Sequence, residues 1–351
     1  MKPHRILSTS STLLLLMLIG LSSTAFAKSV DDVVILNNGD RFTGEIKNLE
    51  HGELEFKSSY MRDSVRLNWA AVARLESKDQ YLVLLTSGRA FTASIRLDET
   101  TGPSNSFRIN SGTGSIGVGK LEVMKIRSAD QRFWAQLKGS IDYGFSYTSG
   151  NSSYQTQFAA AAAYDGEGYL VSSDISSVFN TQSEGSSTRR NTLNTQYWRL
   201  FTPKWFYGGM VDMLNSDQQS LKLRTTLGAG IGRRIVQTSR TTLAAFSGLA
   251  VTRERYSSDE PRPKATNAEA LVGLEFSTFR FRTLDISSRL LVWPSLSDPG
   301  RVRMGLNSNF RIELAKNLFW NLNVYENFDS RPQVNANRND LGITNSFGWT
   351  F

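Results

Sequence analysis

The segment AQLKGSIDYGFSY, residues 135–147, decides the fold class. Its odd-numbered residues are apolar except for Gly139, and the residues between them are polar, charged or small. A period of two over this length places the two sets on opposite faces of a β-strand. The strand therefore has one apolar face and one polar face.

Twelve segments with this alternation follow one another between residues 133 and 351. The alanine run at 159–163 would favour a helix in isolation, but its neighbours have strand and turn character, so we predict a strand there too. The apolar faces of the twelve segments begin at Ala135, Tyr154, Tyr169, Leu193, Trp205, Leu221, Leu243, Ala268, Leu284, Val302, Leu318 and Leu341.

A soluble β-sandwich and a transmembrane β-barrel both contain strands of this kind. Segments of about ten residues match strands that cross an apolar band of ~25 Å at a tilt, and closure of the sheet leaves no edge unpaired in lipid. Short connections such as 202–204 alternate with long ones such as 257–265, and only the connection near 149–151 is shorter than expected. This alternation is typical of outer-membrane barrels.

The outward face of the predicted strands also favours the barrel. Its charged residues lie near strand ends, where a charge costs roughly 0–1 kcal/mol instead of ~2–4 kcal/mol at the midplane, and aromatic residues gather at both ends. The outward charges are Arg199, Arg233, Arg253 and Glu326. We predict an all-β fold, in which residues 133–351 form a transmembrane antiparallel β-barrel of about 12 strands in the cell outer membrane.

Residues 28–127 contain a strand pattern that occurs twice. The residues Gly39, Phe42, Thr43 and Ile46 of the first copy match Gly88, Phe91, Thr92 and Ile95 of the second. Asn38-Gly39 lies between two apolar runs, which is typical of a hairpin turn with positive φ. We predict a duplicated Sm-like or SH3-like β module in the periplasm, built as two small barrels or as one body formed by both copies. Its basic and acidic residues are nearly equal in number, so we expect no nucleic-acid binding.

The first 27 residues have the composition of a signal peptide. Lys2 and Arg5 precede a short apolar stretch at 13–21, and Ala25-Phe26-Ala27 is a small-x-small cleavage site. We predict that residues 1–27 are a cleaved signal peptide. The chain has no cysteine, which excludes thiol catalysis and thiolate zinc sites. His51 lies in a turn-like segment, and we interpret it as a solvated turn residue and not as a metal ligand.

Several short motifs resemble those of a known family. They are the turn Asn38-Gly39-Asp40 with Thr43-Gly44-Glu45-Ile46, the set Trp69, Val72 and Leu75, and the stretch from Leu137-Lys138-Gly139-Ser140 through Gly144 to Gly150-Asn151. Together with the terminal Phe351, this pattern is similar to the YdiY-like salt-induced outer-membrane protein family. The resemblance implies an outer-membrane barrel domain of unknown function and a link to salt or osmotic adaptation. It supplies no catalytic residues.

The inward positions of the predicted barrel carry acidic and basic residues in equal numbers. We select these lumen-lining charges: Lys138, Asp142, Asp174, Asp212, Arg224, Arg289, Arg303, Arg311 and Glu313. They form either a cross-strand ion-pair lattice that fills the barrel, or a constriction for small polar solutes with weak ion selectivity. We interpret Gly228, Gly230 and Gly232 as positions that leave room in the lumen. Residues 133–351 contain no histidine, so we expect no Ser–His hydrolase. A carboxylate-dependent hydrolase would need Asp142 and Asp174 to converge, and no spacing singles them out, so we predict no enzyme and no cofactor.

Two functions remain open from the sequence. The first is a passive channel or envelope protein; the second is a structural or interaction protein with a closed lumen, whose periplasmic domain docks a partner. We expect contacts with outer-membrane lipid and lipopolysaccharide, and with the barrel-assembly machinery during biogenesis. Phe351 resembles the C-terminal aromatic signal that this machinery recognises.

Overall fold

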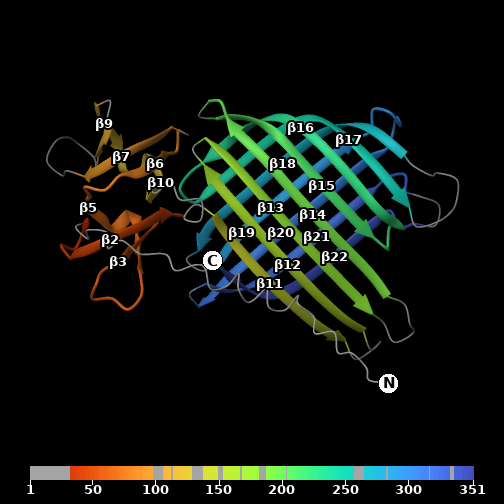
Figure 1. Cartoon of the computed structure of the whole chain (residues 1–351), viewed down its shortest axis with the longest axis horizontal. Coiled ribbons are helices and arrows are strands. Elements are labelled where there is room, and N and C mark those ends of the chain that lie inside the picture. The colour runs from red at the N-terminus through yellow and green to blue at the C-terminus, as the bar shows by residue number, and fades with distance from the viewer. Residues whose placement is uncertain are drawn as a thin grey trace, which may run out of the picture.

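The computed structural model describes residues 32–87, 89–97, 106–111, 114–128, 137–148, 153–166, 168–181, 187–202, 204–256, 265–281, 284–315, 317–332 and 336–351. The predicted signal peptide lies outside these ranges. A ten-stranded module and a twelve-stranded closed barrel lie end to end along the long axis of the molecule (Figure 1). Among the described residues, no helix combines the length and the apolar character that a bilayer crossing requires.

The module contains two copies of one order of elements. The first copy is β1 (Asp32–Leu36), β2 (Arg41–Glu50), β3 (Glu53–Lys57), β4 (Val65–Asn68), the 3-10 helix η1 (Trp69–Ala71) and β5 (Val72–Glu76). The second copy is β6 (Tyr81–Leu85), β7 (Ala90–Leu97), β8 (Ser106–Ser111), β9 (Gly114–Gly119), the 3-10 helix η2 (Lys120–Glu122) and β10 (Val123–Ser128). Gly39 has a φ of 88°, so the predicted turn is present.

The two copies are interleaved and form one body. Strand β2 of the first copy pairs with β10 of the second, and β5 of the first pairs with β7 of the second. One hydrophobic core contains buried residues of both copies, among them Phe56, Leu75, Tyr81 and Ile126. Of the two arrangements that the duplication allows, the body formed by both copies is therefore the one present.

Polar contacts inside the module also join the copies. The Asp32 carboxylate accepts hydrogen bonds from the Ile46 amide and from the Tyr81 hydroxyl, each at 2.8 Å. Burial and this carboxylate raise the pKa of Tyr81 far above its usual value, so the hydroxyl stays a donor. Trp69 donates its indole N–H to the carbonyl of Lys120 at 3.1 Å, and Lys120 donates back to the carbonyl of Ala70 at 3.0 Å.

The barrel strands follow one another in sequence order, each antiparallel to the next, and β22 closes the sheet on β11. The strands are β11 (Leu137–Thr148), β12 (Ser153–Gly166), β13 (Tyr169–Thr181), β14 (Ser187–Leu200), β15 (Trp205–Ser216), β16 (Leu221–Gln237), β17 (Thr241–Tyr256), β18 (Ala265–Phe281), β19 (Leu284–Pro294), β20 (Val302–Ala315), β21 (Leu318–Asp329) and β22 (Asn339–Thr350). The predicted twelve-stranded barrel is confirmed.

Alternation along β11 matches the predicted register. Ile141, Tyr143 and Phe145 have about half of their surface exposed, while Asp142 between them and Ser140 before them are buried. Outward aromatic rings contact one another at the strand ends, as in the pair Tyr164–Tyr169 at 5.8 Å between ring centroids. The barrel thus has an apolar outer surface and a separate interior.

Leu221 departs from the predicted register. The sequence pattern placed it on the outward face, but its side chain is fully buried. The pairing of β16 with β17 shifts between Leu221 and Leu223, so a bulge turns this side chain inward at the start of the strand.

Strands β11 and β22 pair over a short stretch. Ser140–Tyr143 pairs with Phe347–Thr350, and Gly139 and Phe351 exchange two backbone hydrogen bonds of 3.1 and 3.0 Å. A Cβ at Gly139 would lie 2.3 Å from the Phe351 ring, so a side chain at this position would collide with the aromatic residue that ends the seam. Phe351 therefore contributes to barrel closure, and the glycine makes room for it.

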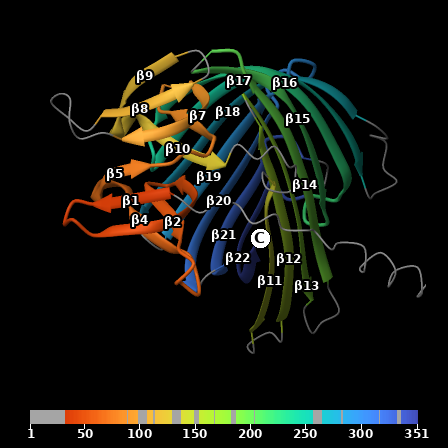
Figure 2. The same cartoon turned by 60° about the vertical axis from the view of Figure 1, so that its left-hand side comes forward.

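The two ends of the barrel differ. Short turns such as 238–240 lie at the end that meets the module, which we call the module end (Figure 2). The opposite end, which carries the connections 217–220 and 295–301, is called the loop end.

Candidate functional site

A cluster of buried ion pairs lies inside the barrel at the loop end. Arg301 donates to both Glu254 oxygens at 2.9 Å and to the Asp329 oxygens at 3.0 and 2.5 Å. Arg224 bridges the same two carboxylates at 2.7 and 3.1 Å. No side chain in these pairs is more than 5% exposed, and the two arginines balance the two carboxylates. We call these four residues the ion cluster.

A second buried pair extends the ion cluster toward the middle of the barrel. Arg303 donates to the Glu269 carboxylate at 2.8 and 2.5 Å and to the Thr252 hydroxyl at 2.9 Å. The guanidinium carbon of Arg303 lies 4.9 Å from the centre of the Trp293 ring. Arg303 therefore connects the ionic layer with an aromatic layer beneath it.

That aromatic layer is an apolar cluster inside the barrel, on the side formed by β14 to β19. Its buried members are Trp198, Phe206, Met210, Ala244, Phe246, Ala250, Leu271, Leu291 and Trp293. Glycines opposite the rings on the neighbouring strands make room for them: a Cβ at Gly232 would lie 2.3 Å from Phe206, and one at Gly273 would lie 2.1 Å from Phe246. Our interpretation that Gly232 leaves open room in the lumen is wrong, because the Phe206 ring occupies that room.

The side of the lumen formed by β11 to β13 and β20 to β22 is polar. Asp142 accepts a hydrogen bond from Ser346 at 2.7 Å, and Asn323 binds Asn307 and Asn309. Several buried polar atoms on this side have no partner within the described residues: Gln157 Oε1, Asn321 Oδ1 and Thr344 Oγ1. Because an unpaired buried polar atom costs about 1–3 kcal/mol, this strip is suited to water or a polar solute.

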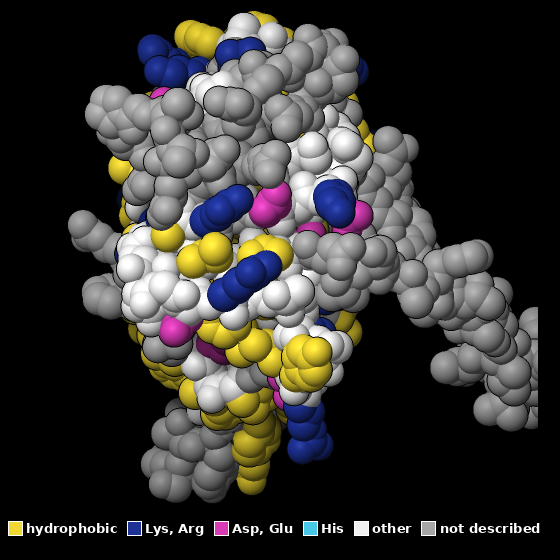
Figure 3. Space-filling model, turned by 90° about the vertical axis from the view of Figure 1, so that its left-hand side faces the viewer, with side chains coloured by type: hydrophobic (Ala, Val, Ile, Leu, Met, Phe, Trp, Pro, Cys, Tyr) yellow, Lys and Arg dark blue, Asp and Glu magenta, His cyan; other side chains and the backbone are white. Residues whose placement is uncertain are grey.

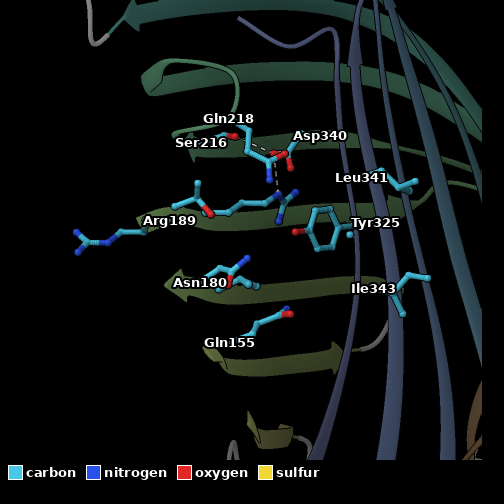
Figure 4. A pocket seen from close by; sticks show the side chains of 13 residues that line it. Gln155, Asn180, Arg189, Ser216, Gln218, Tyr325, Asp340, Leu341 and Ile343 are labelled. Carbon is cyan, nitrogen blue, oxygen red and sulfur yellow. Dashed lines mark hydrogen bonds and ion pairs between the residues drawn. The ribbon is translucent and has the colours of Figure 1, made fainter. Parts of the chain in front are cut away.

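A hollow of about 140 Å³ lies at the loop end of this polar strip. Tyr325 and Asp340 face Ser216, Asn180 and Gln155 across it (Figure 4). Asp340 accepts from Ser216 at 2.8 Å and pairs with Arg190 at 3.4 Å. The Arg190 guanidinium lies 4.0 Å from the centre of the Tyr325 ring, so the base of the hollow is held by packed, charge-balanced groups.

The module covers the other mouth through ion pairs. Arg66 of β4 forms a bidentate pair with Glu313 of β20, with one N–O distance of 2.9 Å. Glu50 of β2 binds Lys125 of the module at 2.8 Å and also binds Lys138 of β11. Gln237 contacts Met124 at 3.4 Å between nitrogen and sulfur. Charge complementarity therefore fixes the module on the barrel.

His51 lies beside this interface, and 41% of its side chain is exposed, in agreement with the predicted turn position. It occupies a turn with a φ of 56°, and its ring nitrogen lies 3.8 Å from Glu50. Burial, opposed by Glu50, lowers its pKa to about 4, and the cations Lys125, Lys138 and Arg66 also lower it. Burial raises the pKa of Glu50, but Lys125 and Lys138 outweigh it and hold that pKa well below its usual range.

The structure divides the nine predicted lumen charges among several places. Arg224 belongs to the ion cluster and Arg303 to its extension, while Lys138 and Glu313 bind the module. Arg289 pairs with Glu275 at 2.9 Å and donates to Asn194, which also contacts Asp212. Asp142 lies near Arg311 on the polar side, and Asp174 is half-buried near Arg289.

Sequence reasoning did not find the apolar cluster inside the lumen. The signal was present, because Trp198, Phe206, Phe246 and Trp293 occupy inward positions of the predicted register. The predicted register places Glu254 and Arg301 on the inward face, but the nine selected charges do not include them, and Asp329 is not predicted to face the lumen. Within the described ranges, no group of three or more histidines, aspartates or glutamates has the arrangement of a metal site.

Replacement of Arg301 by methionine tests the ion cluster. It leaves Glu254 and Asp329 with Arg224 as their shared cation, and loss of one partner from a buried ion network costs about 3–5 kcal/mol. We expect a clear fall in the temperature at which the folded barrel band is lost in semi-native electrophoresis. Arg331→Met is the matched control, because the Arg331–Asp298 pair is exposed and is worth about 0–1 kcal/mol. Equal melting of the two variants would contradict a stabilising role.

His51 gives the module contact a pH dependence. Its folded pKa lies below the unfolded value, so protonation favours the open state and stability is lost as pH falls from about 6.5 to about 4. Glu50 stays ionised in this range. We expect faster hydrogen exchange in β2 and β3 at pH 4.5 than at pH 7.5. His51→Asn, which tolerates the positive φ, should remove most of this difference. An unchanged pH response in the variant would exclude His51 as its source.

Comparison with known proteins identifies a family. The family model described as "Protein of unknown function, DUF481" matches residues 141–351, which confirms the predicted family resemblance. No curated protein matches. Two solved structures are similar to this chain. The translocator domain of autotransporter NalP from Neisseria meningitidis has 12% identity and a TM-score of 0.33, and the match covers 61% of this chain and 87% of that domain. The beta domain of the Bordetella autotransporter Brka, with 11% identity and a TM-score of 0.29, covers 61% and 96%. Because the family model spans more than half of the sequence, the chain belongs to the DUF481 family.

Proposed function

We propose that this chain is an outer-membrane barrel protein with a closed resting lumen, which holds its β module at the periplasmic mouth. The apolar outer surface of the barrel supports the membrane location, because a large exposed apolar surface marks a face that meets lipid or protein. Export through a cleaved signal peptide, and short turns on the periplasmic side, are part of this proposal.

One observation supports the closed lumen: buried side chains fill it at two depths. The ion cluster crosses the lumen between β16, β17 and β21, and the apolar cluster fills the side formed by β14 to β19. The module lies over the remaining mouth. A resting barrel of this kind acts as an anchor, with the module available to a periplasmic partner.

The outer face of the module gives some indication of that partner. On the described part of this face, basic and acidic side chains are interspersed, and no single sign of charge dominates (Figure 3). This distribution favours a protein partner over a nucleic acid. Tyr60 and Leu121, which are 94% and 84% exposed, are single apolar residues that such a partner could cover.

A narrow passive channel is the second candidate, and the polar strip favours it. Buried polar atoms that have no partner among the described residues line β12, β21 and β22 on one side of the lumen. Water or a small polar solute would satisfy them. A role in salt or osmotic adaptation rests only on the family resemblance. We propose no catalytic role for the lumenal carboxylates, because those of the ion cluster are bound by arginines.

Conductance in planar bilayers separates the two candidates. We expect the wild type to insert without steady conductance across a range of salt concentrations. The double variant Arg66→Glu and Lys138→Glu opposes Glu313 and Glu50 with like charge and should release the module without opening a steady conductance, because the ion cluster still closes the loop end. Arg74→Glu is the control, because Arg74 pairs with Glu76 within β5. Steady conductance of the wild type would favour the channel instead.

The membrane location has its own test. Leu249 is 65% exposed in the middle of β17, and Ser287 lies at an inward position of β19. Leu249→Arg should cost roughly 2–4 kcal/mol in lipid and reduce the folded yield in outer membranes, whereas Ser287→Arg places the same charge in the lumen and should be tolerated. Equal yields of both variants would mean that the outer surface does not face lipid.

A further inference from the structure

The seam between β11 and β22 is paired over only part of its length. Pairing between the two strands ends at Tyr143 and Phe347. Gly144 still contacts β22, but the described residues 145–148 of β11 and 339–344 of β22 form no pairs with each other, although both segments are strands. On its other side, β11 pairs with β12 along its whole length. The loop-end part of the seam is therefore unpaired, and we call it the open seam.

Unpaired strand edges are costly in a membrane. The hydrocarbon region contains no water, so the N–H and C=O groups of a free edge have no partner there, and barrels that span membranes pair all their strands. If the barrel spans the outer membrane as proposed above, the backbone groups that β11 and β22 turn toward each other at the open seam need polar partners from another molecule.

The hollow at the loop end reaches the open seam. Its lining includes Gln155 of β12, the strand next to β11, and Leu341, Gly342 and Ile343 of β22, whereas none of the described lining residues belongs to β11. Leu341 and Ile343 line the hollow (Figure 4) although they are outward residues with 61% and 62% of their surface exposed. Because a hollow with lumenal walls also touches outward residues, it extends into the barrel wall at the open seam.

The charged groups of the hollow already have partners. The Arg190 guanidinium lies 3.4 Å from the Asp340 carboxylate and packs on the Tyr325 ring. The Arg189 guanidinium lies 5.8 Å from the ring centre of Phe179, which is an outward residue. The other polar side chains of the described lining are uncharged amides and hydroxyls: Gln155, Asn180, Thr188, Ser216 and Gln218. Such a wall favours a neutral ligand head with several hydroxyl groups, since a hydroxyl both donates and accepts hydrogen bonds.

Polar atoms without partners lie beside the open seam. Gln157 of β12 pairs with Gly144, and Thr344 belongs to the unpaired part of β22. Both side chains are buried, and Gln157 Oε1 and Thr344 Oγ1 have no hydrogen-bond partner among the described residues. Buried polar atoms normally have such a partner. The barrel therefore lacks polar partners at the depth where its seam opens.

The outer surface of β22 also becomes polar at this depth. The outward residues of this strand are apolar except for one: Leu341, Ile343, Asn345, Phe347 and Trp349. The exception, Asn345, is exposed and is the first outward residue beyond the last paired residue, Phe347. An amide on a surface that faces lipid is costly unless a polar group binds it. A polar head at the open seam would provide that group.

We propose that the open seam binds a single-chain amphiphile whose neutral head carries several hydroxyl groups, such as one sugar ring. The head occupies the hollow beside Gln155 and Asn180, and the chain stays in the bilayer along the outward side chains of Leu341 and Ile343. A cavity of about 150 Å³ holds a benzene-sized group, so the hollow of about 140 Å³ has room for one six-membered ring. The apolar chain needs no room inside the barrel, because it leaves the hollow sideways.

Disulfide formation tests whether the seam is open, since the chain has no cysteine of its own. Ile141→Cys with Trp349→Cys joins an outward pair of the ladder, and opposed residues with Cα atoms about 5.5 Å apart can form a disulfide. Tyr147→Cys with Ile343→Cys would join the equivalent pair if the ladder continued. Under mild oxidation of the folded variants, we expect the first pair to cross-link at least tenfold faster. Equal rates in detergent, where the membrane location plays no part, would show a closed seam and overturn the proposal.

Photo-crosslinking of the wild-type chain tests the ligand. The full chain in phosphatidylcholine nanodiscs is exposed to an alkyl glucoside that carries a photoreactive group in its chain. Labelling should concentrate at residues 341–343 and should fall at least fivefold with excess octyl glucoside, but not with octyl sulfate, octyltrimethylammonium or glucose. Equal competition by all three octyl compounds would mean contact without selection of the head, and this would overturn the proposal.

The same head chemistry occurs in membrane glycolipids and in free sugars, and the glucose competition separates these two sources. If glucose competes as well as octyl glucoside, the hollow is a site for free sugars that needs no open seam, and the proposed amphiphile site is wrong.

Two amide substitutions locate the head. Gln155→Leu with Asn180→Leu removes both amides of the hollow wall at similar volume and should lower the labelling of residues 341–343 severalfold. Asn309→Leu, at a lumenal position of β20 outside the lining, is the matched control and should leave labelling unchanged. Mobility in semi-native electrophoresis shows whether each variant is folded. Unchanged labelling of the folded double variant would overturn the assignment of the hollow to the head.

Discussion

Closure of the sheet is the constraint on which the rest of the structure depends. Once twelve strands form a barrel, each second residue must point into an interior of fixed width, and its neighbours must point out. The outward set is uniform, because one apolar surface surrounds the whole barrel. The inward side chains make different kinds of contact at each depth, since residues of distant strands meet there. The ion cluster, the apolar cluster and the polar strip are three local solutions to this one constraint.

The alternation of the strands could be predicted because it depends only on neighbouring residues in the sequence. The contacts inside the barrel could not be predicted, because they join residues of distant strands. The outward placement of Ile141 or Leu249 follows from a period of two, which any strand obeys. The contact of Arg301 with Glu254 joins the 295–301 connection to β17, two segments that do not pair, and it depends on barrel width, tilt and stagger. The bulge at Leu221 depends on the partner strand in the same way. Inward aromatic residues were visible in the sequence, but the glycines that receive their rings lie on other strands.

The module was predictable in outline for the same reason. Its duplication is a local pattern, whereas the pairing of β5 with β7 and of β10 with β2 across the two copies depends on long-range contacts. The apolar residues Leu82 and Leu84 could have indicated docking, because a strand with two apolar faces needs a cover on each. Lys138 and Glu313 occupy lumenal positions by register but lie close enough to the mouth to bind the module. An inward position in the register therefore does not show whether a charged residue lines the lumen or binds the module.

The two seals of the lumen are physically different, and this difference sets how the barrel could respond to its surroundings. The ion cluster is buried and charge-balanced, so salt screens it weakly and removal of one partner leaves a charge in a dry environment. The contact between module and barrel consists of partly exposed ion pairs, which salt screens more strongly. Rising ionic strength would therefore loosen the module well before it disturbs the ion cluster. The loop end thus remains closed while the module end of the barrel becomes sensitive to salt and pH.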